Sequence, residues 1–493
     1  MSSVRAVPSK PAVGNLPYSG YYRRGVLPED AELTHSGAGT PLGEYMRRFW
    51  QPVCLSSQLS DLPHKIRILG EDLVAFRDFD GRVGVLHRHC CHRGASLEYG
   101  IVQQHGIRCC YHGIQFDVDG SILDVPGEPQ AERFKSTLSQ GAYPAFERDG
   151  LVFAYMGPPE LKPAFPEYDA FEKYDDTRLV PFSNVFECNW LQSMDNIADQ
   201  MHTFALHNTA FVYAGRPAPQ GLDFGKTSLS SGFVKLPVMD YAEVRDGTAM
   251  VFIAGRRIDE HRVWVRMNDL IVPNITQHAY LFEDGTQRRL WHRVHMSRWY
   301  VPVDDTHSII FGWRMLGKAI DPHQMGDERK LGWDNMDFLE GQVGNRSYEE
   351  GQRLPGDWEA IVSQRPIAVH ALENPLSGDI GVYMNRRNLR NAVRGKNPAA
   401  DPARMHQRAN AGQPTHCYTN NTVLEIPQRP TPEEDQEMIR QLGRDIVAVA
   451  TAADAYTGRK RDAYVRAKLE ALERRLQLKG PARPRKPAKP LRR

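Results

Sequence analysis

The chain has 493 residues, of which 41% are hydrophobic and 9% aromatic, and its formal net charge is +2 at pH 7. This length exceeds one ordinary core, and the composition excludes a disordered chain, so we expect a globular protein of two or more domains. The first thirty residues contain no apolar core followed by a small-residue cleavage site. No apolar run reaches the roughly 18 to 20 residues of a membrane helix, so we predict a cytoplasmic protein with no membrane association.

One segment differs from the rest in charge. Residues 478–493 contain seven of the 62 basic residues and no acidic residue, which leaves 55 basic against 60 acidic side chains elsewhere. A basic segment this rich in proline cannot bury a core, so we interpret it as a disordered tail. Binding of this tail to nucleic acid or an anionic surface is the alternative, but we predict no nucleic-acid partner.

The predicted elements change in type along the chain. A capped helix is expected at residues 40–50, where Thr40 and Glu44 lie close together, and short β-rich segments separated by Asp-Gly turns follow it. Beyond a proline-rich linker, residues 189–207 have a helical pattern and residues 231–317 return to strands. The predicted units are an extended arm (1–32), a β-domain with an N-terminal helix (33–160), a second domain (161–430), C-terminal helices (431–477) and the basic tail (478–493).

Four of the seven cysteines form two doublets, each followed by a histidine. Such crowding does not fit a disulfide framework and is more typical of metal binding in a reducing compartment. One loop offers C-x-H and the other C-x-x-H, with sixteen residues between them. Two loops that each supply one thiolate and one imidazole indicate a Rieske 2Fe-2S site, with one iron on two cysteines and the other on two histidines. The predicted ligands are Cys90, His92, Cys109 and His112.

Other interpretations of these loops exist. Zinc fingers usually pair two cysteines in one loop and two histidines in the other, which makes a zinc site the weaker alternative. Cys91 and Cys110 are alternative ligands, a disulfide pair or small packing residues, and we favour packing. Gly94 and Gly113 are expected to allow tight turns that present N–H groups to the cluster sulfides.

A family resemblance is carried by CCHRGASL with GIRCCYHGIQFDVDG, and by LTHSGAGTPLGEYMRRFWQPV from Leu33 to Val53. These segments resemble the large (alpha) subunit of the Rieske non-haem iron ring-hydroxylating oxygenases, in the phthalate-dioxygenase-like branch. Cys91 stands where that family often has proline. The resemblance covers about residues 33 to 395. It implies an α+β chain, with a Rieske β-domain and a helix-over-antiparallel-sheet catalytic domain of the START-like, helix-grip type.

An oxygenase of this kind needs a second iron. Asp199, His202 and His207 form the pattern D-x-x-H-x-x-x-x-H, in which a regular helix would place Asp199 and His202 on one face. The two histidines, five residues apart, would point about 140° apart on a regular helix. We therefore expect the helix to be broken or distorted near residues 204–206, so that both imidazoles reach one ferrous ion.

A dioxygen-activating ferrous centre usually takes two histidines and one carboxylate. The segment DWEAIVSQRPI resembles the family segment that delivers the carboxylate, which implies Asp357 as the third ligand. Glu359 is the nearest competitor, and Asp334 and Asp337 are weaker ones. The resemblance further implies that Asp199 bridges His202 to His112 of a neighbouring subunit, in a homotrimer or a multiple of one.

No strand-linked G-x-G-x-x-G motif is present, so we predict that a separate NAD(P)H-dependent reductase, with or without a ferredoxin, supplies the electrons. Arg266, in RVWVRMNDLIVPN, resembles a strand position of the phthalate-like branch and is predicted to pair with a substrate carboxylate. Arg256, Arg257 and Arg262 compete for that role. The predicted reaction uses dioxygen to dihydroxylate an aromatic carboxylic acid, such as a phthalate, or to O-demethylate a methoxy-aromatic acid. A pure electron-transfer Rieske protein is the alternative.

Overall fold

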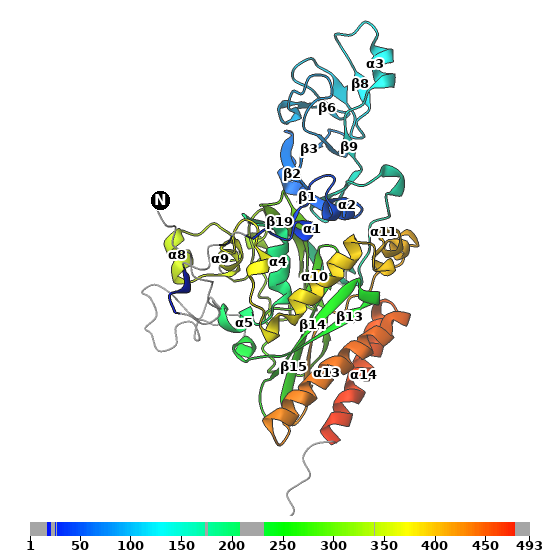
Figure 1. Ribbon diagram of the computed structural model, residues 1–493. Helices are drawn as coiled ribbons and strands as arrows, with labels where there is room; N and C mark the ends of the chain where they lie inside the picture. The colour runs from blue at the N-terminus through cyan, green and yellow to red at the C-terminus, as the bar shows by residue number, and fades with distance from the viewer. Residues whose placement is uncertain are drawn as a thin grey trace, which may run out of the picture.

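The computed structural model of this chain describes residues 17–20, 25, 27–172, 176–207, 231–339 and 341–478. A β-rich N-terminal domain stands at one end of the molecule, and a larger body of helices around one antiparallel sheet makes up the rest (Figure 1). The predicted α+β class is therefore confirmed. Most of the predicted arm, and all of the predicted tail except Leu478, lie outside the described residues. Across these described ranges, no helix has the length and apolar character needed to cross a membrane.

The N-terminal domain contains three small antiparallel sheets, ordered β1-β11-β10, β2-β3-β4-β9 and β5-β6-β7-β8. Helix α2 (Pro41–Arg47) begins as predicted, because the Thr40 hydroxyl accepts the Gly43 N–H at 3.2 Å. The other elements are α1 (Ala31–Thr34), β1 (Trp50–Leu55), β2 (His64–Ile68), β3 (Glu71–Arg77), β4 (Val83–His87), β5 (Ile101–Val102), β6 (Ile107–Arg108), β7 (Gln115–Phe116), β8 (Ile122–Asp124), α3 (Ala131–Thr137), β9 (Ala142–Tyr143), β10 (Ala145–Arg148) and β11 (Leu151–Tyr155).

One antiparallel sheet organises the larger body, in the order β12-β19-β18-β16-β15-β14-β13, and β20 pairs with both β15 and β17. In β15, alternate residues face opposite sides. Val263, Val265 and Met267 belong to the main core cluster, whereas Trp264 belongs to a second cluster on the other face. The strands are β12 (Arg178–Phe186), β13 (Val238–Val244), β14 (Ala249–Arg257), β15 (Arg262–Ile271), β16 (Ile275–Ala279), β17 (Arg289–His292), β18 (Val294–Pro302), β19 (Ser308–Leu316) and β20 (Asn420–Glu425).

Helices cover this sheet. The long helix α13 (Pro432–Ala452) crosses β13 and β14, and α14 (Gly458–Leu478) lies against β17. Gly443 allows the close approach of α13, because a Cβ at this position would come within 2.4 Å of Ile253. The remaining α-helices are α4 (Trp190–Ala198), α5 (His202–Ala205), α8 (Tyr348–Arg353), α9 (Asp357–Val362), α10 (Ile380–Val393), α11 (Pro402–Met405) and α12 (Gln407–Asn410).

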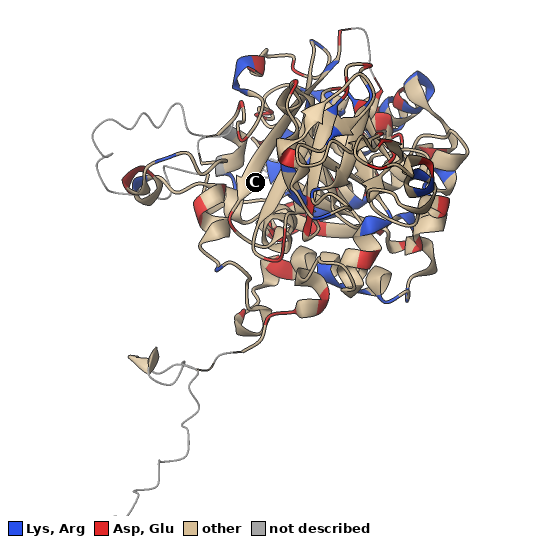
Figure 2. Ribbon diagram, turned by 90° about the horizontal axis from the view of Figure 1, so that it is seen from above, with Lys and Arg blue, Asp and Glu red and all other residues tan. Residues whose placement is uncertain are grey.

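Basic and acidic residues are interspersed over the elements seen from above (Figure 2). The charged residues pair extensively, as in the contacts of Arg390 with Asp30 and Glu32, which join α10 to the start of α1. Such pairing ties the helices around α4 to the N-terminal segment. It thereby fixes the part of the body in which α5 carries His202, one of the predicted iron ligands.

Candidate functional site

Two loops of the N-terminal domain bring the predicted cluster ligands together. The thiols of Cys90 and Cys109 are buried, with 4% and 2% of each residue exposed, in an apolar cluster. The rings of His92 and His112 face one another with centroids 4.6 Å apart, and both residues are exposed. Two buried thiols and two exposed imidazoles match the donor set that a Rieske cluster requires.

The two loops share one backbone design. Gly94 and Gly113 have φ angles of 76° and 75°, a left-handed conformation that glycine adopts without strain. Their N–H groups donate to the carbonyls of Cys90 (2.9 Å) and Cys109 (3.0 Å). The tight turns are therefore as predicted, and the N–H groups of the two glycines close the loops, which leaves the presentation of other loop N–H groups to the cluster sulfides as a prediction.

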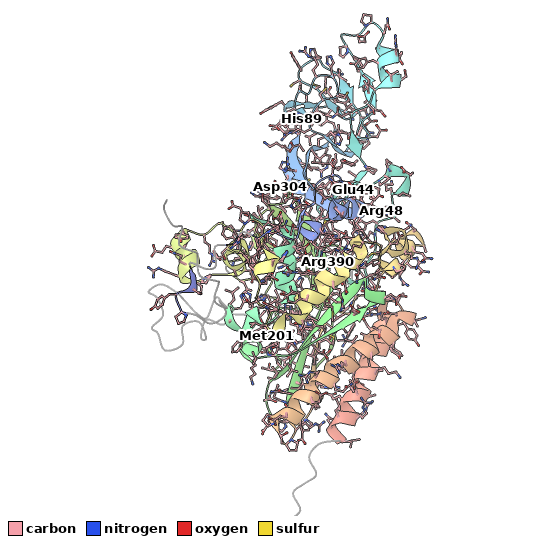
Figure 3. All side chains as sticks on the ribbon, viewed as in Figure 1. Glu44, Arg48, His89, Met201, Asp304 and Arg390 are labelled. Atoms are coloured by element: carbon pink, nitrogen blue, oxygen red, sulfur yellow. The ribbon has the colours of Figure 1, made fainter. Side chains whose placement is uncertain are left out.

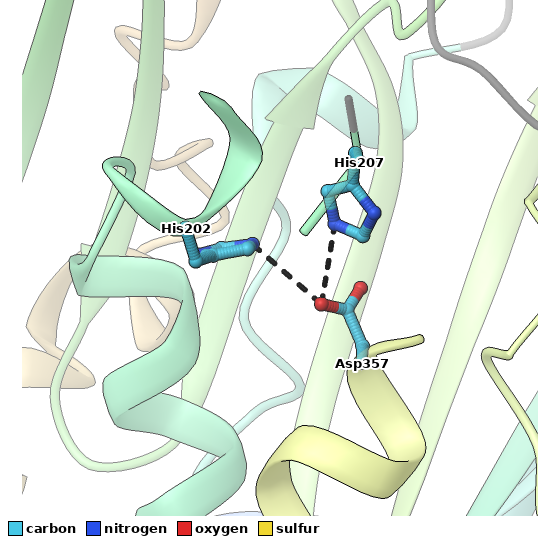
Figure 4. A group of neighbouring side chains, drawn as sticks. All are labelled: His202, His207 and Asp357. Carbon is cyan, nitrogen blue, oxygen red and sulfur yellow. Dashed lines mark ion pairs between the residues drawn. The ribbon is translucent and has the colours of Figure 1, made fainter. Parts of the chain in front are cut away.

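The second site lies in the larger body, where His202, His207 and Asp357 converge (Figure 4). Each offers one ligand atom, and these atoms lie within 4.8 Å of one another. The distances from Asp357 Oδ1 are 3.2 Å to His207 Nε2 and 3.6 Å to His202 Nε2. Two imidazoles and one carboxylate at this spacing can hold one ferrous ion and leave coordination positions open.

The chain reaches this geometry by interrupting the helix. Helix α4 ends at Ala198, Asp199 has extended φ and ψ angles of −90° and 98°, and α5 begins at His202. The Asp199 carboxylate accepts the Met201 N–H at 2.9 Å, which stabilises the turn. The expected break near residues 204–206 is found where α5 ends at Ala205, but a second break precedes His202. The expectation that Asp199 and His202 share one helix face is therefore wrong.

Hydrogen bonds orient the ligand side chains. The Nδ1–H of His202 donates to the main-chain carbonyl of Asp199, so its Nε2 is free to face Asp357. Gln342 donates to Asp357 Oδ2 at 2.6 Å, and Asn196 approaches Oδ1 at 3.4 Å. Burial alone would raise the pKa of Asp357, but His207 and His202 hold it well below its ordinary value. The carboxylate is therefore ionised, as a ligand must be.

Comparison with known proteins identifies the family. Residues 49–137 match the Rieske [2Fe-2S] domain. The chain is 50% identical over 459 residues to the tert-butanol monooxygenase / tert-amyl alcohol desaturase oxygenase subunit of Aquincola tertiaricarbonis, covering 92% of this chain and 96% of that protein. The chain belongs to the Rieske non-haem iron oxygenases. It is an oxygenase subunit of a multicomponent system, and the family's cofactors are a 2Fe-2S cluster and a mononuclear iron.

A further relative supports this assignment, and a solved structure shares the fold. The phenoxybenzoate dioxygenase subunit alpha of Ectopseudomonas oleovorans is 36% identical over 390 residues, covering 76% of this chain and 88% of that protein. The crystal structure of dicamba monooxygenase bound to 3,6-dichlorosalicylic acid shares the fold, with a TM-score of 0.52 at 19% identity, over 71% of this chain and 98% of that chain. The zinc and pure electron-transfer alternatives are therefore wrong for this Rieske oxygenase.

The second cysteine of each doublet lies outside the hydrophobic core of the Rieske domain. Cys91 and Cys110 are exposed and their thiols are free. The interpretation of these residues as packing groups is therefore wrong, and the structure contains no disulfide between them. Cys90 and Cys109, by contrast, are buried, as expected for thiols that bind a cluster.

Replacing His112 with Cys is expected to lower the reduction potential of the cluster, because a thiolate adds negative charge that a neutral imidazole lacks. A fraction of the molecules should still hold a 2Fe-2S cluster. The measurement is a spectroelectrochemical titration of the full chain followed by absorbance and EPR. An unchanged potential with a Rieske-type spectrum would show that a different histidine binds the cluster.

The acidic competitors for the third iron ligand of the oxygenase have other partners. Glu359 pairs with Arg346 and accepts the Gly356 N–H at 2.8 Å, which caps α9. Asp334 accepts the Val185 N–H at 2.9 Å, and Asp337 forms a buried ion pair with Arg314. Asp357 is thus the acidic side chain that the structure directs at the two histidines.

A small cavity of about 50 Å³ borders the iron-site residues of the oxygenase. Arg266, which the sequence analysis predicts to pair with a substrate carboxylate, lines it, and so do Arg298 and His278, which sequence reasoning missed. Arg298 lies over Phe182 and Phe338, 5.9 and 5.6 Å from their ring centroids. No local motif marks these residues, because only the pairing of β15, β16 and β18 brings them together.

The other candidate arginines divide into two kinds. Arg257 forms an ion pair with Asp435, and Arg262 forms one with Asp259. Both guanidinium groups therefore have a carboxylate partner, and neither residue lines the cavity. Arg256 is fully buried next to Phe233 and Trp264, 5.0 and 5.1 Å from their ring centroids. Its two Nη atoms have no hydrogen-bond partner among the described residues. Among the described residues, therefore, neither Arg256 nor Arg266 has a carboxylate partner.

Proposed function

We propose that this chain is the terminal oxygenase that inserts oxygen from dioxygen into an aromatic carboxylic acid, by ring dihydroxylation or O-demethylation. Its electrons come from an NAD(P)H-dependent reductase, directly or through a ferredoxin. Arg266, a buried arginine that lines the same cavity as the iron-site residues and has no carboxylate partner among the described residues, carries the substrate part of this proposal. The phenoxybenzoate dioxygenase relative supports it, because its name specifies an aromatic acid.

In this proposal, Cys90, His92, Cys109 and His112 hold the 2Fe-2S cluster, and His202, His207 and Asp357 hold the ferrous ion. The cluster supplies single electrons and the ferrous ion supplies dioxygen activation. The protein binds and orients the substrate and excludes bulk water. His207 and Asp357 are buried deeply enough for this, since their side chains are 6% and 13% exposed.

The substrate carboxylate would bind at Arg266. Arg266 is 2% exposed, its Nη1–H donates to the Tyr280 carbonyl at 2.9 Å, and its Nε has no partner among the described residues. Burial lowers the pKa of Arg266 to about 9, helped by the neighbouring charge of Arg256. A buried cation without a counter-charge is costly, and a bound carboxylate would supply that charge through paired N–H donors.

A small tertiary alcohol is the second candidate substrate. The relative with 50% identity over 92% of this chain is named for tert-butanol and tert-amyl alcohol. The cavity of about 50 Å³ also favours a compact molecule over an aromatic ring. In this alternative, polar groups of the cavity such as Asn268 and His278 would bind the alcohol hydroxyl.

Product analysis separates the two candidates. The full chain, with cluster and ferrous iron and a surrogate reductase, would be supplied with ¹⁸O₂ and a panel of phthalates, methoxybenzoates, tert-butanol and tert-amyl alcohol. Label in an aromatic diol, or formaldehyde from a methoxybenzoate, supports the aromatic-acid proposal. Oxidation of the tertiary alcohols alone would replace it with the second candidate.

Replacing Arg266 with Gln is expected to weaken the binding of aromatic acids by about 2 to 5 kcal/mol, which is roughly 30-fold or more in Kd. Neutral analogues of the same shape should lose far less, because they have no charge to pair with the guanidinium. Arg262→Gln is the matched control, since Arg262 lies on the same strand but pairs with Asp259. Equal losses for acids and neutral analogues would contradict the carboxylate role.

We further propose a homotrimer, or a multiple of one, in which the cluster of one subunit serves the iron of the next. His89 is next to the cluster ligand Cys90, and Met201 is next to the iron ligand His202. The two labelled residues lie in different parts of one chain, so the two metal sites of a single subunit are separated (Figure 3). His92 and His112 are exposed and so are available to a neighbour. A cavity of about 470 Å³, lined by Asp199, His202 and other residues, provides a docking position.

A further inference from the structure

Gln140 is a buried side chain of the Rieske domain for which the proposed reaction provides no role. It precedes β9 and is 3% exposed. Its Nε2 donates to the carbonyls of His87 at 2.7 Å and His89 at 3.0 Å. Its Oε1 accepts the Cys91 N–H at 2.8 Å. One carboxamide thus makes three hydrogen bonds to the backbone on both sides of Cys90.

These bonds act on the loop that carries half of the cluster ligands. Gln140 is itself fixed, because its N–H donates to the Gly120 carbonyl at 2.9 Å. The Cys91 N–H belongs to the peptide directly after Cys90, and Gln140 keeps it engaged. Hydrogen bonds near the cluster sulfurs and the local charge set the reduction potential of iron–sulfur centres. A side chain that controls this peptide is therefore placed to control the potential.

We propose that Gln140 is a positioning residue that fixes the loop at residues 87–91 and so sets the reduction potential and retention of the cluster. The role requires a carboxamide, since a carboxylate has no N–H for the two carbonyls and leucine has neither donor nor acceptor. The inference rests on the assignment of Cys90 and His92 as ligands. No group is transferred, so the proposal concerns the environment of the cluster and not the chemistry of the substrate.

The test compares Gln140→Glu and Gln140→Leu in the full chain with its cluster. Gln140→Glu should lower the reduction potential, because it adds a negative charge beside the loop. The new carboxylate would also repel the His87 and His89 carbonyls that Gln140 now binds. Both variants should alter the EPR g-values of the reduced cluster and release iron to a chelator about 10-fold faster or more. Gln103→Glu is the matched control, since Gln103 lies in the same domain and donates to the Val102 carbonyl at 3.0 Å. It should keep the wild-type potential and g-values.

Different failures of this test have different meanings. If both Gln140 variants keep the wild-type potential, g-values and release rate, the positioning role is overturned. A lowered melting temperature together with a wild-type potential and EPR spectrum would likewise overturn it, because Gln140 would then be structural only. If the wild-type chain shows no Rieske-type EPR signal, the ligand assignment itself fails. Gln140→Leu keeps the test decisive if Gln140→Glu does not fold.

Discussion

Asp357→Ala is expected to abolish turnover and remove the ferrous ion while leaving the Rieske absorbance intact. The carboxylate of Asp357 completes the set of His202 and His207, and two imidazoles alone hold ferrous iron weakly. Iron analysis of the loaded chain should therefore fall from about three atoms per chain to about two, because the cluster retains its pair. Substrate-dependent oxygen uptake measures the loss of turnover.

Glu359→Ala is the matched control for Asp357→Ala. Glu359 lies on the same helix, two residues further on, but pairs with Arg346 instead of the iron site. This variant should keep about three irons per chain, although α9 loses part of its cap and the protein loses some stability. Full activity in Asp357→Ala would move the third ligand elsewhere. Equal iron loss in both variants would show that the helix, and not the carboxylate, is needed.

Asp199→Asn is expected to slow single-turnover oxidation of the reduced cluster by about 10- to 100-fold, with both metals bound and the assembly intact. One carboxylate oxygen of Asp199 already accepts the Met201 N–H at 2.9 Å, which leaves the second oxygen for His112 of a neighbouring copy. If the amide oxygen of asparagine keeps the Met201 N–H, its NH2 group replaces the second carboxylate oxygen, and an NH2 group cannot accept the imidazole N–H of His112. The measurement is stopped-flow absorbance of the cluster with substrate and dioxygen present.

Asp379→Asn serves as the control. Asp379 lines the same cavity of about 470 Å³ as Asp199, so this variant also removes one negative charge from it. The Asp379 carboxylate, however, accepts the Leu376 N–H at 2.6 Å and has no proposed role in electron transfer. The single-turnover rate of Asp379→Asn should stay near that of the wild type. A wild-type rate in Asp199→Asn would exclude the bridge between subunits. A slow rate together with loss of ferrous iron would instead make Asp199 a support of the iron site or of the fold.

The cluster loops were predictable because their chemistry is local. C-x-H and C-x-x-H place a thiolate and an imidazole within a few residues of each other, so spacing alone identified Cys90, His92, Cys109 and His112. The α+β class was implied by the family resemblance, and the sequence of strand and helix patterns along the chain agreed with it. The exposure of Cys91 and Cys110 was not predictable, because a short hydrophobic residue next to a ligand faces the core or the solvent according to the loop conformation.

The iron site shows where sequence reasoning ended. The D-x-x-H-x-x-x-x-H pattern and a family resemblance together predicted His202 and His207, and the same resemblance implied Asp357. Residue spacing alone could not place a carboxylate 150 residues beyond His207 in the same site. Only the packing of α9 against α4 brings it there, and only the turn at Asp199 lets both imidazoles face it. Gln342, Arg298 and Gln140 carry no motif, because their roles depend on backbone groups and strands that are distant in sequence. Local spacing thus determined the prediction of the cluster ligands, whereas contacts between distant segments decided which carboxylate faces the two histidines, which hydrogen bonds support it and which charges line the cavity.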